Sequence, residues 1–186
     1  MTILRGYRGC DIFLPRYPEF HGKVKFLSFL VPSRTHVRQY QVYASETFKL
    51  VDEINNRYGS SEWKPVEIFH ENNYPQAIAG LSLYDVLLVN PVADGMNLVA
   101  KEGPMVNTRN GVLILSEGAG AWEQLRDHVL SVAPADVEGT ARAIHQALTM
   151  SQVERKARAD AMRLAVENED ITAWLYHQFE DLRLIS

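Results

Sequence analysis

The pattern that most restricts the fold of this chain is an alternation of short apolar runs with segments of helical periodicity. The apolar runs cover residues 24–31, 66–69, 85–90, 111–115 and 128–132. Continuous runs of β-forming residues are typical of strands that are buried on both faces. Buried strands that alternate with helices predict βαβ units. The chain is therefore predicted to be an α/β protein with a mainly parallel sheet and flanking helices.

Helical periodicity predicts the remaining elements. The first helix fills residues 1–14 and ends at Pro15 and Pro18, because proline breaks helices. No repeat, low-complexity tract or linker divides the 186 residues, so we expect one domain with a helical tail over 151–186. The other predicted helices are 37–58, which Gly59 caps, and 75–83, 98–106, 121–125, 137–149, 152–168 and 171–182.

Composition excludes several classes of protein. The formal net charge is −4, from 19 Lys and Arg against 23 Asp and Glu, which argues against a nucleic-acid binder. The chain begins with no apolar run, and we expect neither a signal peptide nor a membrane helix. The single cysteine, Cys10, forms no internal disulfide, which favours a reducing compartment and a cytoplasmic location.

Several isolated residues are interpreted as packing residues. They are Cys10, Trp63, Trp122 and Trp174, which are scattered along the chain. The last predicted helix carries an apolar stripe, for which two alternatives stay open. The stripe either folds onto its own domain or is exposed for contact with another. It consists of Ile171, Trp174, Leu175, Phe179 and Leu182.

Three polar loops follow strands, over residues 32–34, 70–73 and 90–97. In a doubly wound sheet, ligands bind beyond the carboxyl ends of the strands, in the loops that lead into helices. The alternation of elements predicts that all three loops lie on one edge of the sheet.

The loop 90–97 is the richest of the three in chemistry. Gly95 permits close backbone approach or a positive φ. The N–H groups from Met96 to Val99 are the expected free donors of the following helix, which suit a diphosphate. The carboxylate of Glu102 suits two adjacent hydroxyls, such as a ribose diol. The alternative is that Asp94 only caps the helix and that Glu102 is a solvated surface acid.

The other polar groups also have two interpretations. Arg34 suits a phosphate or carboxylate, or forms a surface ion pair. The loop 70–73 (His-Glu-Asn-Asn) offers hydrogen-bonding groups, or only turn chemistry. The turn at 118–121 (Gly-Ala-Gly-Ala) is a weak nucleotide signal, because it lacks the full dinucleotide-binding spacing. No histidine pair has metal-ligand spacing, and no Gly-x-Ser-x-Gly elbow is present.

The segment 85–102, DVLLVNPVADGMNLVAKE, closely resembles the trehalose-6-phosphate synthases. These are retaining glycosyltransferases with two facing Rossmann-like domains, the GT-B arrangement. The segments 31–34, 111–117, 136–139 and 147–150 match the family in the same order. The resemblance covers nearly the whole chain and implies that residues 1–186 are the nucleotide-sugar-binding C-terminal domain.

The resemblance also implies roles for individual residues. Asp94, the catalytic-site residue, would bond hydroxyls of the donor glucose, and Arg34 would contact the phosphate of glucose-6-phosphate. Asn72 would lie at the nucleobase, although its loop departs from the commoner family sequence, so the base stays open between uridine and another. The donor would be a nucleotide diphosphate-glucose such as UDP-glucose, and its binding run would be Gly95, Met96, Asn97, Leu98, Val99, Ala100, Lys101 and Glu102.

The implied reaction transfers glucose to glucose-6-phosphate with retention, without an enzymatic nucleophile, cofactor or metal. The match begins at Ile3. In the family this position comes just after a strand and a loop with the pattern Arg…Ser-Lys. The match also does not include the family's N-terminal domain, which supplies most of the acceptor site. We therefore expect a domain truncated at its N-terminus and inactive alone, which needs that domain or a second copy of itself. Absence of the strand, central in the usual order, leaves a gap, a collapsed sheet or an open edge.

Two alternative functions stay open. One is a non-catalytic nucleotide-sugar-binding or interaction domain that keeps the fold. The other is half of a related transferase with a different acceptor.

Overall fold

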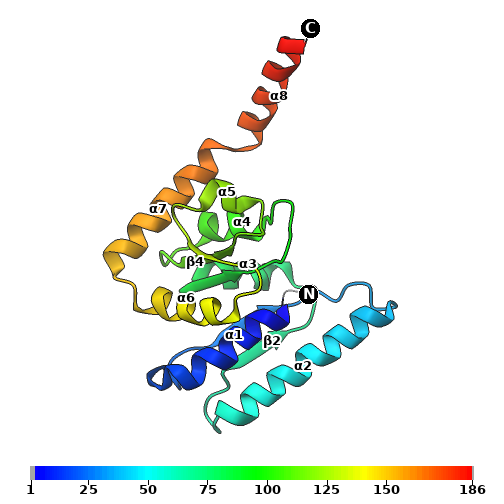
Figure 1. The fold of residues 1–186 in the computed structure, drawn as a ribbon, viewed down its shortest axis with the longest axis vertical. Helices are drawn as coiled ribbons and strands as arrows, with labels where there is room; N and C mark the ends of the chain where they lie inside the picture. Colours follow the sequence, from blue (N-terminus) through cyan, green and yellow to red (C-terminus); the bar gives the residue numbers. More distant parts are fainter. Residues whose placement is uncertain (1–2, 186) are drawn as a thin grey trace.

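The computed structural model describes residues 3–185, which form eight α-helices, one short 3-10 helix and five strands (Figure 1). The α-helices occupy the predicted positions to within three residues at each end, whereas the 3-10 helix was not predicted. The strands are β1 (Phe26–Phe29), β2 (Val66–Phe69), β3 (Val86–Val89), β4 (Val112–Ser116) and β5 (Leu130–Val132). The helices are α1 (Ile3–Arg16), η1 (Pro18–Phe20), α2 (Arg38–Tyr58), α3 (Tyr74–Leu83), α4 (Val99–Val106), α5 (Ala121–Leu125), α6 (Val137–Thr149), α7 (Gln152–Asn168) and α8 (Ile171–Ile185).

Every strand pairing is parallel, as predicted, but the strands form two sheets. β1 pairs with β2, with Phe26 opposite Val66. The second sheet has the order β3-β4-β5, with Val86 opposite Val112. β1 and β3 are not hydrogen-bonded to each other, so the sheet is interrupted at the expected place and leaves β1 and β3 as edge strands.

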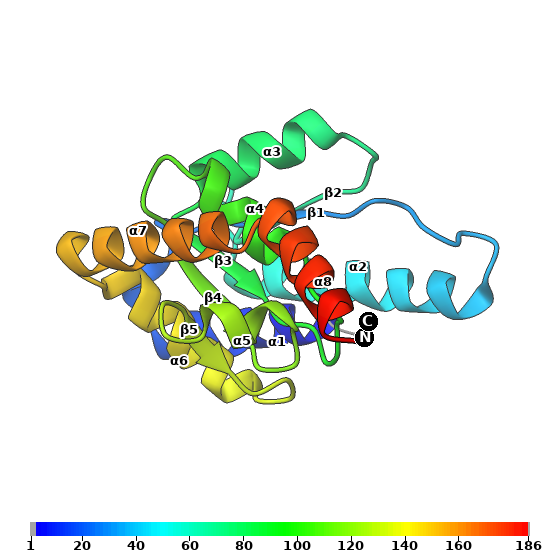
Figure 2. The same ribbon diagram turned by 90° about the horizontal axis from the view of Figure 1, so that it is seen from above.

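Helices cover both faces of the second sheet (Figure 2). Val112 and Ile114 of β4 pack with α1, α2 and α6 in one core, to which β1 and β2 also contribute. Leu113 and Leu115 pack on the opposite face against residues of α4, α5 and α7. Successive side chains of β4 thus point into two different apolar cores, one on each face of the sheet.

The prediction that the strands are buried on both faces is correct for β4 and wrong for β1. All five residues of β4 are buried, whereas none of the four residues of β1 is fully buried. Leu27 is 48% exposed. β4 has a hydrogen-bonded strand on each side, whereas β1 has one only on the side of β2.

The N-terminal helix differs from its predicted end. α1 continues to Arg16, so that Pro15 lies in its last turn instead of ending it. Pro15 has no N–H to donate to the carbonyl of Asp11, and the hydroxyl of Tyr58 donates to that carbonyl at 3.4 Å. The helix then ends before Pro18, which begins η1. Cys10 is buried in the core as predicted, and burial raises the pKa of its thiol.

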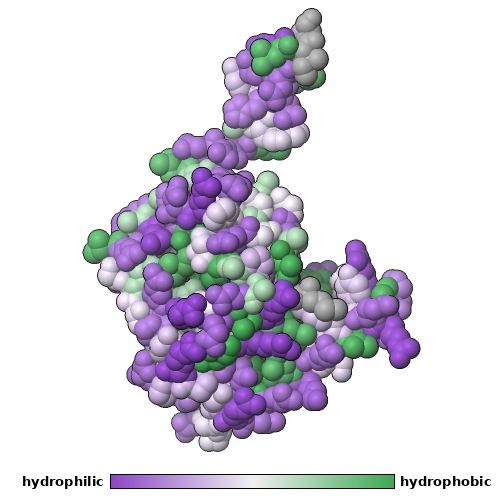
Figure 3. Space-filling model, viewed as in Figure 1, coloured by the Kyte–Doolittle hydropathy of each residue, from purple (hydrophilic) through white to green (hydrophobic). Residues whose placement is uncertain are grey.

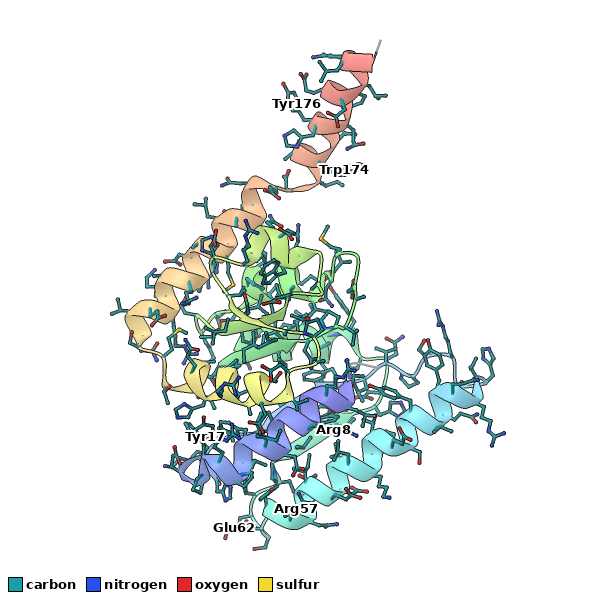
Figure 4. All side chains as sticks on the ribbon, in the orientation of Figure 1. Arg8, Tyr17, Arg57, Glu62, Trp174 and Tyr176 are labelled. Carbon is teal, nitrogen blue, oxygen red and sulfur yellow. The ribbon has the colours of Figure 1, made fainter. Side chains whose placement is uncertain are left out.

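The tail divides into a packed helix and a projecting one. Arg155 of α7 donates to the carbonyl oxygens of Asp85 and Asn110, at 3.1 and 3.2 Å, and so ties α7 to the second sheet. α8 extends away from the body, and Trp174 projects from it at 57% exposure (Figures 1 and 4). Trp174 is therefore not a packing residue in this structure. The apolar stripe of α8 is exposed, which was one of its two alternatives, and Figure 3 shows apolar side chains on the surface of this helix.

None of the helices over residues 3–185 combines the length and the apolar character that a membrane crossing requires.

Candidate functional site

The segment between β3 and α4 forms a tight polar turn. The Asp94 carboxylate accepts hydrogen bonds from the Met96 N–H and from Asn97 Nδ2, both at 3.2 Å. The side-chain oxygen of Asn97 accepts from the Ala100 N–H at 3.3 Å. Asp94 therefore organises the turn itself, and Asn97, not Asp94, bonds to the first turn of the helix.

A positive φ occurs in this turn, but not where the sequence suggested. Asn97 has φ 72°, whereas Gly95 does not lie in the left-handed region. Asparagine tolerates the left-handed region better than other residues with a side chain, because its short amide bonds to the local backbone. Gly95 is exposed, and a Cβ added there would meet nothing within 4 Å. The absence of a side chain at Gly95 thus leaves the backbone of the turn open from outside.

A second loop, between β4 and α5, holds the turn in place. The Asp94 N–H donates to the Gly118 carbonyl at 2.9 Å, and the Gly120 N–H donates to the Asp94 carbonyl at 2.9 Å. The Ala121 N–H donates to the Met96 carbonyl at 2.8 Å. These backbone bonds fix the turn to the end of the most deeply buried strand.

The glycines of this second loop permit the close contact. A Cβ on Gly120 would lie 2.0 Å from the Gly95 oxygen, and one on Gly118 would lie 2.4 Å from the Val92 oxygen. Both positions therefore exclude a side chain. The sequence showed a glycine-rich turn here but not its partner, since pairing of the two loops depends on the order of the strands.

The start of α4 leaves backbone donors unused. The N–H groups of Asn97, Leu98 and Val99 donate to no group in the part of the chain that the structure describes. The expected run of free donors is thus one residue shorter, because the Met96 N–H is taken by Asp94. Three adjacent N–H groups at a helix N-terminus suit an anion.

The remaining residues of the predicted donor run lie on α4. Ala100 is buried against the sheet, whereas the side chains of Lys101 and Glu102 are half-buried. Arg163 of α7 donates to the carbonyl oxygens of Pro104 and Asn107, at 3.2 and 3.1 Å, and so fixes the far end of α4. The structure therefore brings the predicted residues from Asp94 to Glu102 together on one supported turn and helix.

Arg34 lies outside this cluster. It follows β1 on an exposed loop, with φ 49°, and its guanidinium donates to the Tyr40 hydroxyl. Its guanidinium carbon also lies 5.2 Å from the centre of the Tyr40 ring. The segment between β1 and α2 extends away from the body (Figure 2). Among the described residues, Arg34 forms neither the ion pair considered as an alternative nor a hydrogen bond with the Asp94 turn.

Asn72 is exposed on the loop after β2. Its neighbour Asn73 caps α3, with the Asn73 side-chain oxygen accepting from the Gln76 N–H at 3.1 Å. Turn chemistry therefore explains Asn73, while Asn72 stays available. The structure does not join Asn72 to the Asp94 turn.

Neither the surface hollows nor the metal-ligating residue types form a second candidate site among the described residues. Two hollows lie along α2 and not at the turn; the first is lined by Gln41, Phe48, Lys49 and Asn56, among others. Over residues 3–185, no group of three or more His, Cys, Asp or Glu side chains is placed to hold a metal ion.

Comparison with known proteins identifies the relatives of this chain. The profile of Glycosyltransferase family 20 matches residues 3–184. A bifunctional trehalose-6-phosphate synthase/phosphatase of Thermoproteus tenax is 39% identical over 175 residues, which are 92% of this chain and 24% of that protein.

Solved structures of similar fold include two with ligands. An α,α-trehalose-phosphate synthase (UDP-forming) of Burkholderia xenovorans, in complex with glucose-6-phosphate, superposes with a TM-score of 0.91 at 31% identity and covers 98% of this chain. An E. coli protein bound with UDP-2-fluoro glucose superposes with a TM-score of 0.91 at 33% identity and covers 97% of this chain. This chain spans 40% and 41% of those two chains.

Proposed function

The chain belongs to glycosyltransferase family 20, and we propose that it is the donor-binding half of an α,α-trehalose-6-phosphate synthase. In this proposal it binds a nucleotide diphosphate-glucose, UDP-glucose first of all, whose glucose is transferred to glucose-6-phosphate with retention. The observation that carries the proposal is the turn at Asp94–Asn97, because three N–H groups at its end are free and the Asp94 carboxylate lies within the same turn.

The free donors suit the chemistry of the leaving group. When the bond between the glucose C1 and the diphosphate oxygen breaks, negative charge grows on the diphosphate and positive charge on the sugar. The N–H groups of Asn97, Leu98 and Val99 would stabilise the negative charge, together with the N-terminal end of the α4 dipole. Preorganised backbone donors do not need to reorient during the reaction, and the bonds between the turn and Gly118–Ala121 hold them in place.

The two carboxylates would hold hydroxyl groups at the two ends of the donor. Asp94 would accept from hydroxyls of the glucose, and Glu102 from the adjacent hydroxyls of the ribose. Glu102 is half-buried on α4, one side of which is fixed by α7. A carboxylate that is partly shielded from water forms stronger hydrogen bonds than a fully solvated one, which suits the proposed contact of Glu102 with a diol.

The acceptor and the nucleobase would meet the other sheet. Arg34 would contact the phosphate of glucose-6-phosphate, and Asn72 the base. Both side chains are exposed on loops that follow β1 and β2, where a ligand can reach them. The B. xenovorans relative was solved in complex with glucose-6-phosphate, which supports this acceptor.

Isothermal titration calorimetry of the 186-residue chain with UDP-glucose tests the proposal. We expect measurable binding that Glu102→Ala weakens by about tenfold or more, since a lost hydrogen bond to a charged group is worth about 1.5–3 kcal/mol. Glu62→Ala is the matched control, because Glu62 is exposed near the foot of α2, remote from α4 (Figures 1 and 4).

Absence of heat at millimolar UDP-glucose and at millimolar concentrations of other nucleotide-glucoses would contradict the proposal and favour an interaction domain. We also expect no transfer to glucose-6-phosphate by this chain alone, because most of the acceptor site would lie outside residues 1–186. Robust turnover by the purified chain would show that the division into donor and acceptor halves is wrong.

A further inference from the structure

The short helix α4 depends on contacts at its two ends. It has eight residues, and Pro104 within it has no N–H to donate to the Ala100 carbonyl. An isolated helix shorter than about 12 residues is only marginally stable in water, so tertiary contacts must hold α4 in place. The turn at its beginning is bonded to the loop 118–121. A separate set of contacts holds its far end.

The first contact at the far end is made by Asn107, the residue that follows α4. Its N–H donates to the Gly103 carbonyl at 3.0 Å. Its side-chain Nδ2 donates to the Tyr84 carbonyl at 3.0 Å, and its side-chain oxygen accepts from the Gly111 N–H at 2.8 Å. The buried amide of Asn107 therefore joins the end of α4 to the segments that precede β3 and β4.

The second contact comes from Arg163 of the tail helix α7. Its Nε donates to the Pro104 carbonyl at 3.2 Å, and its Nη2 donates to the Asn107 carbonyl at 3.1 Å. Its Nη1 donates to the Asp160 carboxylate at 2.9 Å, and this ion pair orients the guanidinium. One planar cation thus bonds two carbonyl oxygens at the C-terminal end of α4, where a positive charge also suits the helix dipole.

The opposite side of α4 lies close against the sheet. A Cβ on Gly103 would lie 2.5 Å from the Leu87 side chain of β3, so the two elements are in direct contact there. This packing limits movement of α4 toward β3, and the bonds of Arg163 limit movement away from α7. The far end of α4 is therefore held between the sheet and the tail helix.

The position of the far end matters at the near end. A helix of eight residues is about 12 Å long and moves as a unit, because its rise is 1.5 Å per residue. The free N–H groups of Asn97, Leu98 and Val99 lie at its beginning. A tilt of α4 at Pro104 would therefore displace the groups to which the diphosphate is assigned.

We propose that Arg163 is a positioning residue of the donor site, which holds α4 so that its free N–H groups meet the diphosphate. This inference rests on the donor-binding function proposed above. Arg163 touches no part of the donor in this account and acts through the carbonyls of Pro104 and Asn107. The tail helix α7 is then part of the donor site, although no residue of α7 was among the predicted site residues.

Isothermal titration calorimetry of the full chain with UDP-glucose and with UDP tests this role. Arg163→Met keeps an unbranched apolar stem and removes the bonds to both carbonyls. We expect it to weaken the binding of each ligand by about fivefold or more, because displaced donors lose their alignment with the ligand. The two ligands should lose affinity by the same factor, since the diphosphate is common to both.

Arg158→Met is the matched control. Arg158 also lies on α7, and its side chain is 26% exposed, against 27% for Arg163. It donates to the Val129 carbonyl at 3.2 Å and to the Glu154 carboxylate at 3.0 Å, but to no group of α4 in the described chain. Urea denaturation should show similar losses of stability in the two variants, whereas only Arg163→Met should lose affinity.

Arg163→Lys separates position from charge. Lysine keeps the positive charge but lacks the planar fork that bonds two carbonyls, so the affinity should stay about threefold weaker or more. This variant carries the test if Arg163→Met does not fold. Full affinity in Arg163→Lys would show that the charge alone suffices and would contradict a positioning role.

Other outcomes would also overturn the inference. They are unchanged affinity in Arg163→Met, equal losses of affinity in Arg163→Met and Arg158→Met, and a loss for UDP-glucose that UDP does not share. Absence of UDP-glucose binding by the unaltered chain would overturn the donor-binding function and this inference with it. Binding by the unaltered chain that Arg163→Met leaves unchanged would overturn the role of Arg163 alone.

Discussion

The two sheets of this protein differ in how completely they are built. The β3-β4-β5 sheet has helices on both faces, and its central strand is buried along its whole length. The β1-β2 pair has no fully buried residue in β1 and only Val66 in β2. The loop that combines free backbone donors with the Asp94 carboxylate follows β3, in the better covered sheet. The loops after β1 and β2 carry Arg34 and Asn72, which are exposed.

Under the proposed function, this difference would correspond to two different tasks of the two sheets. A donor site needs donors that are fixed before the ligand arrives, and the better covered sheet would supply the support for them. The exposed residues of the other sheet would suit the proposed contacts with the acceptor and the nucleobase. The following predictions compare the two sheets, from the largest expected effect to the smallest.

The largest effect is expected from truncating a leucine in each sheet. Leu113 of β4 is fully buried, so Leu113→Ala should lower the free energy of unfolding by about 2–5 kcal/mol. Leu27 of β1 is 48% exposed, and Leu27→Ala should cost less than about 1 kcal/mol. Urea denaturation followed by circular dichroism measures both. Equal losses would show that the two sheets are equally well packed.

The next effect concerns the two loops that form the site. Gly120→Ala places a Cβ against the Gly95 carbonyl and should destabilise the fold by about 1–3 kcal/mol. It should also weaken UDP-glucose binding by about tenfold or more, because the turn must shift. Gly95→Ala is the matched control for stability, since a Cβ there meets nothing within 4 Å. Thermal melts measure the stability and calorimetry measures the UDP-glucose affinity. Full affinity in a folded Gly120→Ala protein would argue against the turn at Asp94–Asn97 as the donor site.

The smallest effect is expected at Arg34. Its side chain is exposed and, among the described residues, bonds to and stacks on Tyr40 alone, so Arg34→Ala should change the free energy of unfolding by less than about 0.5 kcal/mol. UDP-glucose affinity should also stay the same, because Arg34 is assigned to the acceptor. A loss of donor affinity in this variant would move Arg34 into the donor site and weaken the division between the two sheets.

Much of the fold was predictable from local sequence. Continuous apolar runs separated by helical periodicity predict the order of the five strands and eight α-helices, although not the short helix η1, and the helices 121–125, 137–149 and 152–168 have their predicted ends. Strand ends were less accurate: the run 24–31 shortens to Phe26–Phe29. A strand needs a partner along its length, and β1 has only one neighbour to pair with.

The site was predictable as a segment but not as a geometry. The string from Asp94 to Glu102 was located from its residues and its resemblance to a family. The positive φ at Asn97 was not foreseen, because asparagine reaches that region through local hydrogen bonds that a sequence does not display. The roles of Gly118 and Gly120 were missed for another reason, since their contact with the turn is made across neighbouring strands.

The central claim is tested most directly by two-dimensional NMR of the backbone amides during a titration with UDP-glucose. The account predicts that the largest chemical-shift changes fall on the amides of Asn97, Leu98 and Val99, which have no acceptor in the described chain. Smaller changes should reach the neighbouring segment 118–121, and the amides of β1 and β2 should change least. Shifts concentrated on the β1-β2 sheet, or none at millimolar UDP-glucose, would contradict the assignment of the donor site to this turn.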